Sequence, residues 1–227
     1  MLYDKQAKFR SHITLVSRGA RLHGNGLGGT GLLVHLLLSR GPGFGPSGEH
    51  VSNSTDYPIQ WERVATTRDN VTYRIRPICT EDAARERAFI LGLSRESRHD
   101  RMMYTMREPS PALVDRFVRV DYHHNMAFVA VVGQGGDERI IGVARYAADS
   151  DNGYEFAVVT ADEWQARGVA ATLSKLLFDY ARIEGIRTLY ANILVSNHRM
   201  IELARWLGMS IHFTPQDSMV VRASADL

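Results

Sequence analysis

Apolar and polar residues follow different patterns on the two sides of about residue 59. Upstream, short apolar patches stand between two stretches rich in glycine and proline, HGNGLGGTG and RGPGFGPSGEH. Downstream, apolar residues recur with the spacing of strands and helices, which predicts a packed core. We therefore predict a poorly ordered extension over residues 1–58, with a short helix near 31–39, and a folded domain over residues 59–227.

The first half of the folded domain is expected to contain two strands followed by helices. A polar turn at 68–70 separates two strand-like runs, and good helix-capping residues then stand before apolar runs of helical spacing. The pattern predicts strands over 61–66 and 71–76, a helix capped by Thr80 that ends near 93, a helix within 94–106, and a helix that starts at Ser110-Pro111.

Strands dominate the second half. Continuous or alternating apolar runs are bounded by turn residues, and two helical runs end at Gly185 and Gly208. The elements expected are strands over 126–132, 139–148 and 154–160, a helix over 168–184, a strand over 188–195, a helix over 199–207, and strands over 210–213 and 219–222. This order indicates an α+β (mixed α/β) domain on one largely antiparallel sheet with flanking helices.

Composition narrows the possible partners. The 227-residue chain has a net charge of only +2, and residues 1–48 hold six basic residues and one acid, so the folded part is mildly acidic and no nucleic-acid partner is expected. The apolar runs are far shorter than the roughly 20 residues of a membrane span, so no membrane partner is expected. The lone cysteine, Cys79, excludes an internal disulfide and favours a reducing, cytoplasmic location.

The stretch 154–171, YEFAVVTADEWQARGVAA, carries the strongest chemical signal. An apolar strand holds one acid, Glu155, which is a candidate general base. The strand leads through Gln165–Ala170, which fits the pattern R/Q-x-x-G-x-G/A, into a helix whose N-terminal N–H groups can hold phosphate. An ordinary strand–loop–helix connection explains the same six residues, so both interpretations stay open.

Asn197 adds a second wall to this candidate site. It follows the strand 188–195 and is placed to cap the next helix. Its side chain can serve as an ordinary cap, or it can also reach a ligand that lies between the two strands.

Two other motifs are weak. Gly24, Gly26 and Gly29 fit G-x-G-x-x-G without the strand that a dinucleotide site needs, and the adjacent His123-His124 have no partner spacing for a metal, so none is expected.

These motifs together resemble the GNAT superfamily of acyl-CoA-dependent N-acyltransferases, in which a strand, a pyrophosphate loop and a helix precede a strand, an asparagine and a second helix. More narrowly, the chain resembles the GNAT domain of Pat-type bacterial protein lysine acetyltransferases. The superfamily resemblance covers about 160 residues, from the 60s to near 215. The narrower match includes IRPI with Glu81-Asp82, LSRES with Arg101, DY before MAFVA, YEFAV, WQ, and Asn197 through Leu207-Gly208.

The resemblance implies a GNAT-like fold and an acetyl-CoA site in a V-shaped gap between strands 154–160 and 188–195. It implies that Val158, Val159 and Thr160 offer backbone to the pantetheine arm and that Asn197 lies near the thioester. The pyrophosphate is then held by the loop residues Gln165, Ala166, Arg167, Gly168, Val169 and Ala170.

Glu155 is then the expected catalytic base, because a lysine amine of pKa near ~10.4 must lose a proton before it attacks. The alternative is a solvated glutamate or one paired with Arg145. Many members of the superfamily place a tyrosine acid in the last helix, where this chain has Ala204. The expected function is acetylation of a protein lysine. Acetylation of a small amine and non-catalytic acyl-CoA binding stay open, as does the oligomeric state.

Overall fold

The computed structural model describes residues 57–103, 108–149, 153–214 and 217–227, and the following statements concern these residues. Eight strands form one sheet in the order β1-β2-β3-β4-β5-β6-β8-β7. The strands are β1 (Arg63–Thr66), β2 (Thr72–Pro77), β3 (Asn125–Val132), β4 (Arg139–Ala148), β5 (Tyr154–Thr160), β6 (Thr188–Leu194), β7 (Ser210–Thr214) and β8 (Asp217–Asp226).

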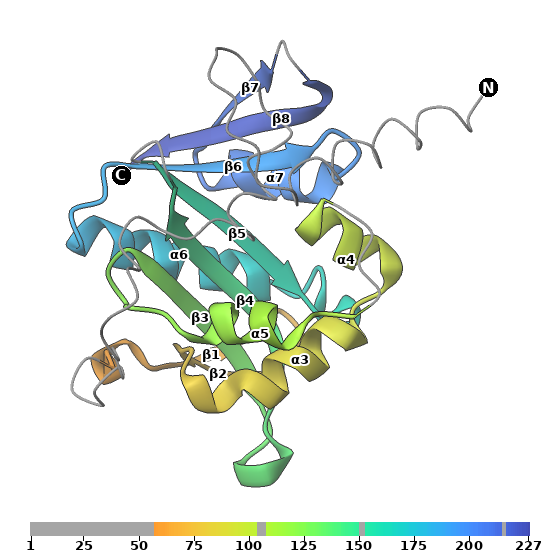
Figure 1. Ribbon diagram of the computed structural model, residues 1–227, viewed down its shortest axis with the longest axis vertical. Coiled ribbons are helices and arrows are strands. Elements are labelled where there is room, and N and C mark those ends of the chain that lie inside the picture. Colours follow the sequence, from red (N-terminus) through yellow and green to blue (C-terminus); the bar gives the residue numbers. More distant parts are fainter. Residues whose placement is uncertain (1–56, 104–107, 150–152, 215–216) are drawn as a thin grey trace, which may run out of the picture.

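Five α-helices and four short 3-10 turns complete these segments (Figure 1). The helices are α3 (Ala83–Gly92), α4 (Arg95–Met102), α5 (Pro111–Val118), α6 (Val169–Ile183) and α7 (His198–Trp206), and the turns are η1 (Ile59–Trp61), η2 (Thr80–Asp82), η3 (Gly135–Asp137) and η4 (Asp162–Trp164). The expected mixed α/β class with a largely antiparallel sheet is confirmed. The extension expected over 1–58, with its short helix near 31–39, lies outside the described residues except for Tyr57 and Pro58.

Helices α3, α4 and α5 lie on one face of the sheet, and α6 lies on the other (Figure 1). Side chains alternate along a strand, so neighbours on β5 point to opposite faces. Phe156 packs edge-on against Phe178 of α6, with ring centroids 5.1 Å apart. On the other face, the Arg145 guanidinium of β4 lies 4.3 Å from the ring of Phe117 in α5. Glu155 therefore faces the layer of α3, α4 and α5, and not α6.

The strand β3 runs through the hydrophobic core. Its residues 126–131 are fully buried, as their continuous apolar run predicts. The sheet changes direction at β5 and β6, which are parallel and form a ladder at the pair Glu155 and Tyr190, whereas every other neighbouring pair of strands is antiparallel. Beyond that pair the two strands part, and this opening positions the site described below.

Three elements differ from the sequence prediction by two residues or more at a boundary. The expected strand 61–66 begins two residues late, because Trp61 closes a 3-10 turn and packs its ring 5.0 Å from that of Tyr180. Thr80 does not cap a helix, because it opens the turn η2, and α3 starts at Ala83. Strand β8 extends from Asp217 to Asp226, since both β6 and β7 pair with it and hold even its polar residues in the ladder.

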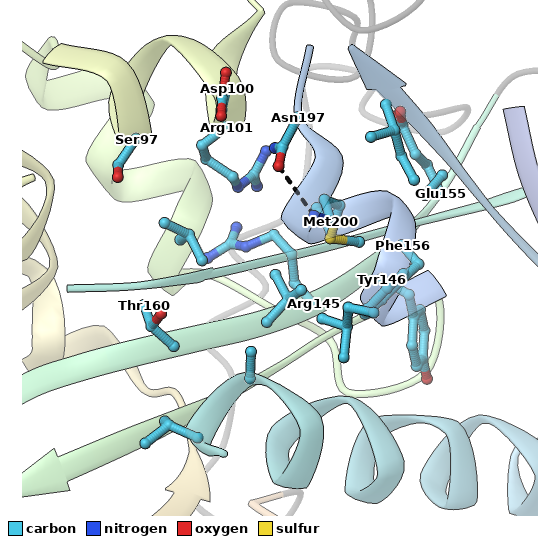
Figure 2. Close-up of a pocket in the computed structure, with 18 of the residues that line it drawn as sticks. Ser97, Asp100, Arg101, Arg145, Tyr146, Glu155, Phe156, Thr160, Asn197 and Met200 are labelled. Atoms are coloured by element: carbon cyan, nitrogen blue, oxygen red, sulfur yellow. Dashed lines mark hydrogen bonds between the residues drawn. The ribbon is translucent and has the colours of Figure 1, made fainter. Parts of the chain in front are cut away.

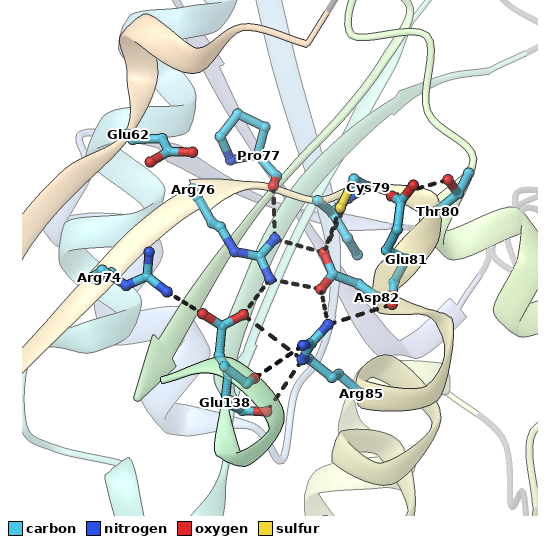
Figure 3. A network of polar contacts seen from close by, with 12 residues as sticks. Glu62, Arg74, Arg76, Pro77, Cys79, Thr80, Glu81, Asp82, Arg85 and Glu138 are labelled. Carbon is cyan, nitrogen blue, oxygen red and sulfur yellow. Dashed lines mark hydrogen bonds and ion pairs between the residues drawn. The ribbon is translucent and has the colours of Figure 1, made fainter. Parts of the chain in front are cut away.

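An ion network explains the shifted start of α3 (Figure 3). Arg76 of β2 donates two hydrogen bonds to the Asp82 carboxylate, at 2.7 and 2.6 Å, and a third to Glu138 at 2.7 Å. Arg74 and Arg85 also pair with Glu138. Asp82 is fully buried, so this bidentate pair compensates its desolvation. The network ties β2, the start of α3 and the β3–β4 hairpin together, away from the opening between β5 and β6.

Candidate active site

A cavity of about 1660 Å³ occupies the opening between β5 and β6. Its walls come from both strands, from α4 and α5, from the first turn of α6 and from α7 (Figure 2). Residues Val158, Val159 and Thr160 line it from β5, and Ala191, Asn192 and Ile193 line it from β6. The separated strand ends thus give the chain a deep site with backbone groups on both sides.

The loop before α6 has the backbone shape of an anion cradle. Ala166 and Gly168 both adopt left-handed conformations, with φ of 59° and 93°. No side chain caps α6 in the described part of the chain, so the N–H groups of its first turn remain available. Left-handed residues that alternate with right-handed or extended ones turn successive N–H groups inward, and the dipole of a fifteen-residue helix adds positive potential. The observed loop therefore fits a pyrophosphate.

Most residues of the expected phosphate loop line the cavity, and Arg167 does not. Its guanidinium pairs with Asp69 at 3.2 Å and lies over the Trp164 ring at 5.2 Å. Arg68 lines the cavity instead. The Arg68 N–H donates to the Arg167 carbonyl at 3.0 Å, and its side chain lies 3.8 Å from where a Cβ on Gly168 would stand. Sequence reasoning missed Arg68 because it belongs to the β1–β2 turn, and no spacing connects that turn to the loop.

Glu155 is almost sealed from solvent, at 3% exposure, and lines the cavity. The amide of Asn192 on β6 donates to its Oε1 at 3.1 Å, and no hydrogen-bond partner among the described residues reaches its Oε2. Burial raises the pKa of Glu155 to about 7, although Asn192 and the more distant Arg101 and Arg222 lower it. A carboxyl with this pKa exchanges protons at neutral pH, as a general base must.

The alternative ion pair between Glu155 and Arg145 does not form. Arg145 turns to Glu86 of α3, with a shortest N–O distance of 3.5 Å. The carboxyl of Glu155 is instead held by the neutral Asn192, which the sequence analysis did not single out. The parallel register of β5 and β6, with Glu155 opposite Tyr190, brings Asn192 into reach. That register depends on the fold, and neighbouring sequence positions give no sign of it.

Asn197 lines the cavity and caps α7, accepting a hydrogen bond from the N–H of Met200 at 3.0 Å. Ala204 is fully buried in the same helix and offers no proton donor. Of the described tyrosines, Tyr146 lines the cavity, but its hydroxyl donates to the His123 carbonyl at 3.0 Å. Neither Ala204 nor Tyr146 therefore offers a free hydroxyl donor to the cavity.

A chain of hydrogen bonds crosses the mouth of the cavity. Arg199 of α7 donates to Gln165 Oε1 at 2.5 Å, and Gln165 Nε2 donates to Ser97 Oγ at 3.0 Å. Ser97 Oγ in turn donates to Asp162 at 2.7 Å, and Asp162 also accepts from the N–H and hydroxyl of Ser94, each at 2.8 Å. The chain joins α7, the loop before α6 and the start of α4, so it fixes α4 relative to this loop.

Two other reactive side-chain types do not form a site. Cys79 is half-buried, and burial, followed by the nearby Asp82, raises its thiol pKa to about 12, so it is a poor nucleophile. His123 pairs with Glu184 and His124 with Asp121. Among the described residues, no group of three or more histidine, cysteine or acidic side chains is arranged to hold a metal. No helix in the same part of the chain has the length and apolar character to cross a bilayer.

Three comparisons with known proteins agree on the family. The model of the "Acetyltransferase (GNAT) family" matches residues 92–209. "Acetyltransferase PA5475" of Pseudomonas aeruginosa is 42% identical over 148 residues, which cover 65% of this chain and 80% of that protein. The structure of the GNAT domain of S. lividans PAT superposes with a TM-score of 0.70 at 30% identity, covering 75% of this chain and 99% of that domain.

"Acetyltransferase Pat" of Mycolicibacterium smegmatis is a more distant relative. It is 27% identical over 156 residues, which cover 68% of this chain but 44% of that protein. The chain thus spans less than half the length of this relative, and the similarity concerns one part of it.

Proposed function

The chain belongs to the GNAT family of acetyltransferases, which are acetyl-CoA-dependent N-acyltransferases, and from this premise we propose that it acetylates lysine side chains of proteins. Glu155 carries the proposal, because a buried carboxyl with a pKa near neutrality lies where β5 and β6 part. The likeness to the GNAT domain of a PAT protein supports a protein acceptor. A cytoplasmic location, where acetyl-CoA and protein lysines are both abundant, belongs to the same proposal.

Acetyl-CoA would supply the acetyl group as a thioester, and the residues present fit it. The first-turn N–H groups of α6 and the left-handed Ala166 and Gly168 would hold the pyrophosphate. Arg68 would add a positive charge beside the same loop. The backbone of Val158, Val159 and Thr160 lines the cavity beyond the point where β6 leaves β5. Their strand groups would bind the pantetheine arm.

The first chemical task of the protein is to remove a proton from the acceptor. A free lysine has a pKa near ~10.4, so about one amine in a thousand is uncharged at neutral pH. Glu155 Oε2 is unpartnered among the described residues and would take the proton, directly or through a water molecule. Asn192 holds Oε1 and so keeps the carboxyl in one orientation. General bases placed in this way typically contribute 10²- to 10⁴-fold.

The second task is to stabilise negative charge on the thioester oxygen and on the leaving thiolate. Backbone N–H groups of β5 that the parting of β6 leaves without a partner strand are suited to the first. Ala204 stands in the position of the family tyrosine, so that position offers no proton to the leaving group. A CoA thiolate is a good leaving group, so we propose that it departs unaided and is protonated by water.

Labelled acetyl-CoA, offered with a panel of lysine-containing proteins and small amines, tests the proposal. Mass spectrometry of the products should find acetyl groups on protein lysine side chains. If label appears on small amines alone, the protein is an acetyltransferase whose acceptors are small amines and not protein lysines. Binding of acetyl-CoA by calorimetry without turnover on any acceptor would instead indicate a non-catalytic acyl-CoA-binding protein.

A further inference from the structure

Arg145 is the least explained charged group in the cavity. It lies on β4, its side chain is 11% exposed, and it lines the cavity (Figure 2). Its Nη2 donates to the carbonyl of Phe117 at 3.2 Å and approaches Glu86 at 3.5 Å, while the guanidinium plane stands against the Phe117 ring. An arginine this deeply buried is normally saturated with partners, because desolvating the charge is costly.

The other donors of Arg145 are not used. In the described part of the chain, no hydrogen bond engages its Nε or Nη1, and neither nitrogen is sealed from the cavity as an unpartnered buried atom. The Glu86 pairing is incomplete too, since Glu86 Oε2 has no hydrogen-bond partner among the described residues. The guanidinium therefore presents an open edge with N–H groups in a fixed fork, and a carboxylate matches this geometry.

Arg145 lies on the same face of the sheet as Glu155. In the antiparallel ladder, Arg145 stands opposite Ala157 and Ala147 stands opposite Glu155, so Arg145 and Glu155 are diagonal neighbours on one face of the sheet. Diagonal neighbours are about 7–8 Å apart. Arg101 of α4 also lines the cavity and acts electrostatically on both side chains, which adds to the positive potential there. The phosphate loop begins beyond Thr160, at the opposite end of β5, so the phosphates have their own cradle.

We propose that Arg145 binds a carboxylate that the acceptor carries near its reactive amine. The inference rests on the proposed function, and it narrows the acceptor class of the same site. Two sources have this chemistry: an acidic side chain beside the acceptor lysine of a protein, and the α-carboxylate of a free amino acid. A charge-assisted fork selects the ionised acid over its amide, because the amide leaves the guanidinium donors poorly paired.

Matched acceptors separate the two sources. The first pair is a capped peptide with glutamate beside its lysine and the same peptide with glutamine. The second pair is L-lysine and L-lysinamide. We expect at least about a tenfold higher kcat/KM for the acid of one pair, carried mainly by KM. A preference in the peptide pair assigns the carboxylate to a protein, and a preference in the lysine pair assigns it to an amino acid. Equal turnover of acid and amide in both pairs overturns the proposal.

Substitutions at Arg145 test whether this residue causes the preference for the acid over the amide. Arg145→Lys keeps a positive charge beside Glu86 and loses the fork, so the acid-to-amide ratio should fall below about threefold. If that variant does not fold, Arg145→Met combined with Glu86→Gln removes both buried charges and should abolish the ratio. Arg119→Lys is the matched control, because Arg119 lines the same cavity but is already paired with Asp115 at 2.7 Å. A ratio that survives the substitutions at Arg145 overturns the proposal.

Direct binding separates this inference from the proposed function. Glutarate should shift the Nε–H resonance of Arg145 in the wild-type protein, assigned by its loss in Arg145→Lys, and glutaramide should not. If no acceptor is acetylated and glutarate still produces the shift, the carboxylate site stands and the proposed function falls. If glutarate leaves the resonance unchanged, the carboxylate site falls whatever the catalytic result.

Discussion

The amide of Asn192 donates a hydrogen bond to Glu155 Oε1 at 3.1 Å, and this contact joins the two strands where they begin to part. It leaves the second carboxyl oxygen, Oε2, with no partner among the described residues. One oxygen is thus fixed and the other is available, which is the arrangement that a general base needs. The contact also opposes the effect of burial, because a donor to a carboxylate favours its charged form.

Removing this donor should move the pH dependence of catalysis. In Asn192→Ala, the ionised form of Glu155 loses its hydrogen bond, so the pKa should rise and the alkaline plateau of kcat/KM should be reached about one pH unit higher. Initial rates across the neutral range measure the shift. Asn125→Ala serves as control, since Asn125 lines the same cavity while Glu155 takes its hydrogen bond from Asn192. An unchanged profile in Asn192→Ala would exclude this positioning role.

Glu155 should also make stability depend on pH. Its folded-state pKa, about 7, lies above the ordinary value of 4.5, so the folded protein binds the extra proton between these values. Stability should therefore fall as pH rises through this window and level off above it. Glu155→Gln lacks the buried charge and should be more stable than wild type by on the order of 3 kcal/mol at about pH 8, with a much smaller difference near pH 4.5.

Urea unfolding of the wild type and Glu155→Gln at both pH values measures this difference. The comparison of the two pH values is its own control, since packing changes from the substitution act equally at both. A gap that does not depend on pH would mean that the folded-state pKa is close to the ordinary one.

The hydrogen-bond chain at the cavity mouth should matter for the acceptor more than for acetyl-CoA. Ser97→Ala removes the hydrogen bonds that Ser97 of α4 makes with Gln165 and Asp162, so it should loosen α4 where this helix lines the cavity. We expect the acceptor KM to rise about three- to tenfold, as for the loss of one hydrogen bond, with less than a twofold change in the acetyl-CoA Kd. Ser110→Ala removes the cap of α5 and is the matched control. Equal effects of both substitutions would argue against a specific role of the chain.

A substitution at Gly168 tests whether the loop before α6 binds the phosphates of CoA. A Cβ at this position would meet no atom closer than 3.8 Å, but φ of +93° is strained for any residue with a side chain. Gly168→Ala should therefore cost about 1–2 kcal/mol in stability or shift the loop, and weaken CoA binding in calorimetry by about tenfold. Gly92→Ala, in a helix and with nothing within 4 Å, should leave CoA affinity unchanged. Unaltered CoA affinity in Gly168→Ala would remove the loop from the binding site.

Local sequence patterns predicted most of the fold. The buried run of β3, the helix from Val169 and the glycine stops are each determined by residues close in sequence, and the structure has them. The predicted start of α3 was wrong by two residues, because Asp82 is held by Arg76 of β2 and this contact outweighs the local capping preference of Thr80.

The site was predictable where it is continuous in sequence. The stretch 154–171 indicated both Glu155 and the loop, and the structure places them in one cavity. Arg68, Asn192 and Arg145 join them through strand register and turn packing, which one-dimensional spacing does not encode. Arg167 belongs to the same loop motif, but its side chain pairs with Asp69 and does not line the cavity.

The most direct test of Glu155 as the catalytic base is the pH dependence of kcat/KM for wild type and Glu155→Gln, with acetyl-CoA and an acceptor lysine. The account predicts that wild-type activity rises with pH through about 7, where Glu155 loses its proton. It also predicts that kcat/KM of Glu155→Gln is lower by about 10²- to 10³-fold and shows no inflection near this pH, while acetyl-CoA binding persists. A Glu155→Gln enzyme with the wild-type rate and profile would contradict the account.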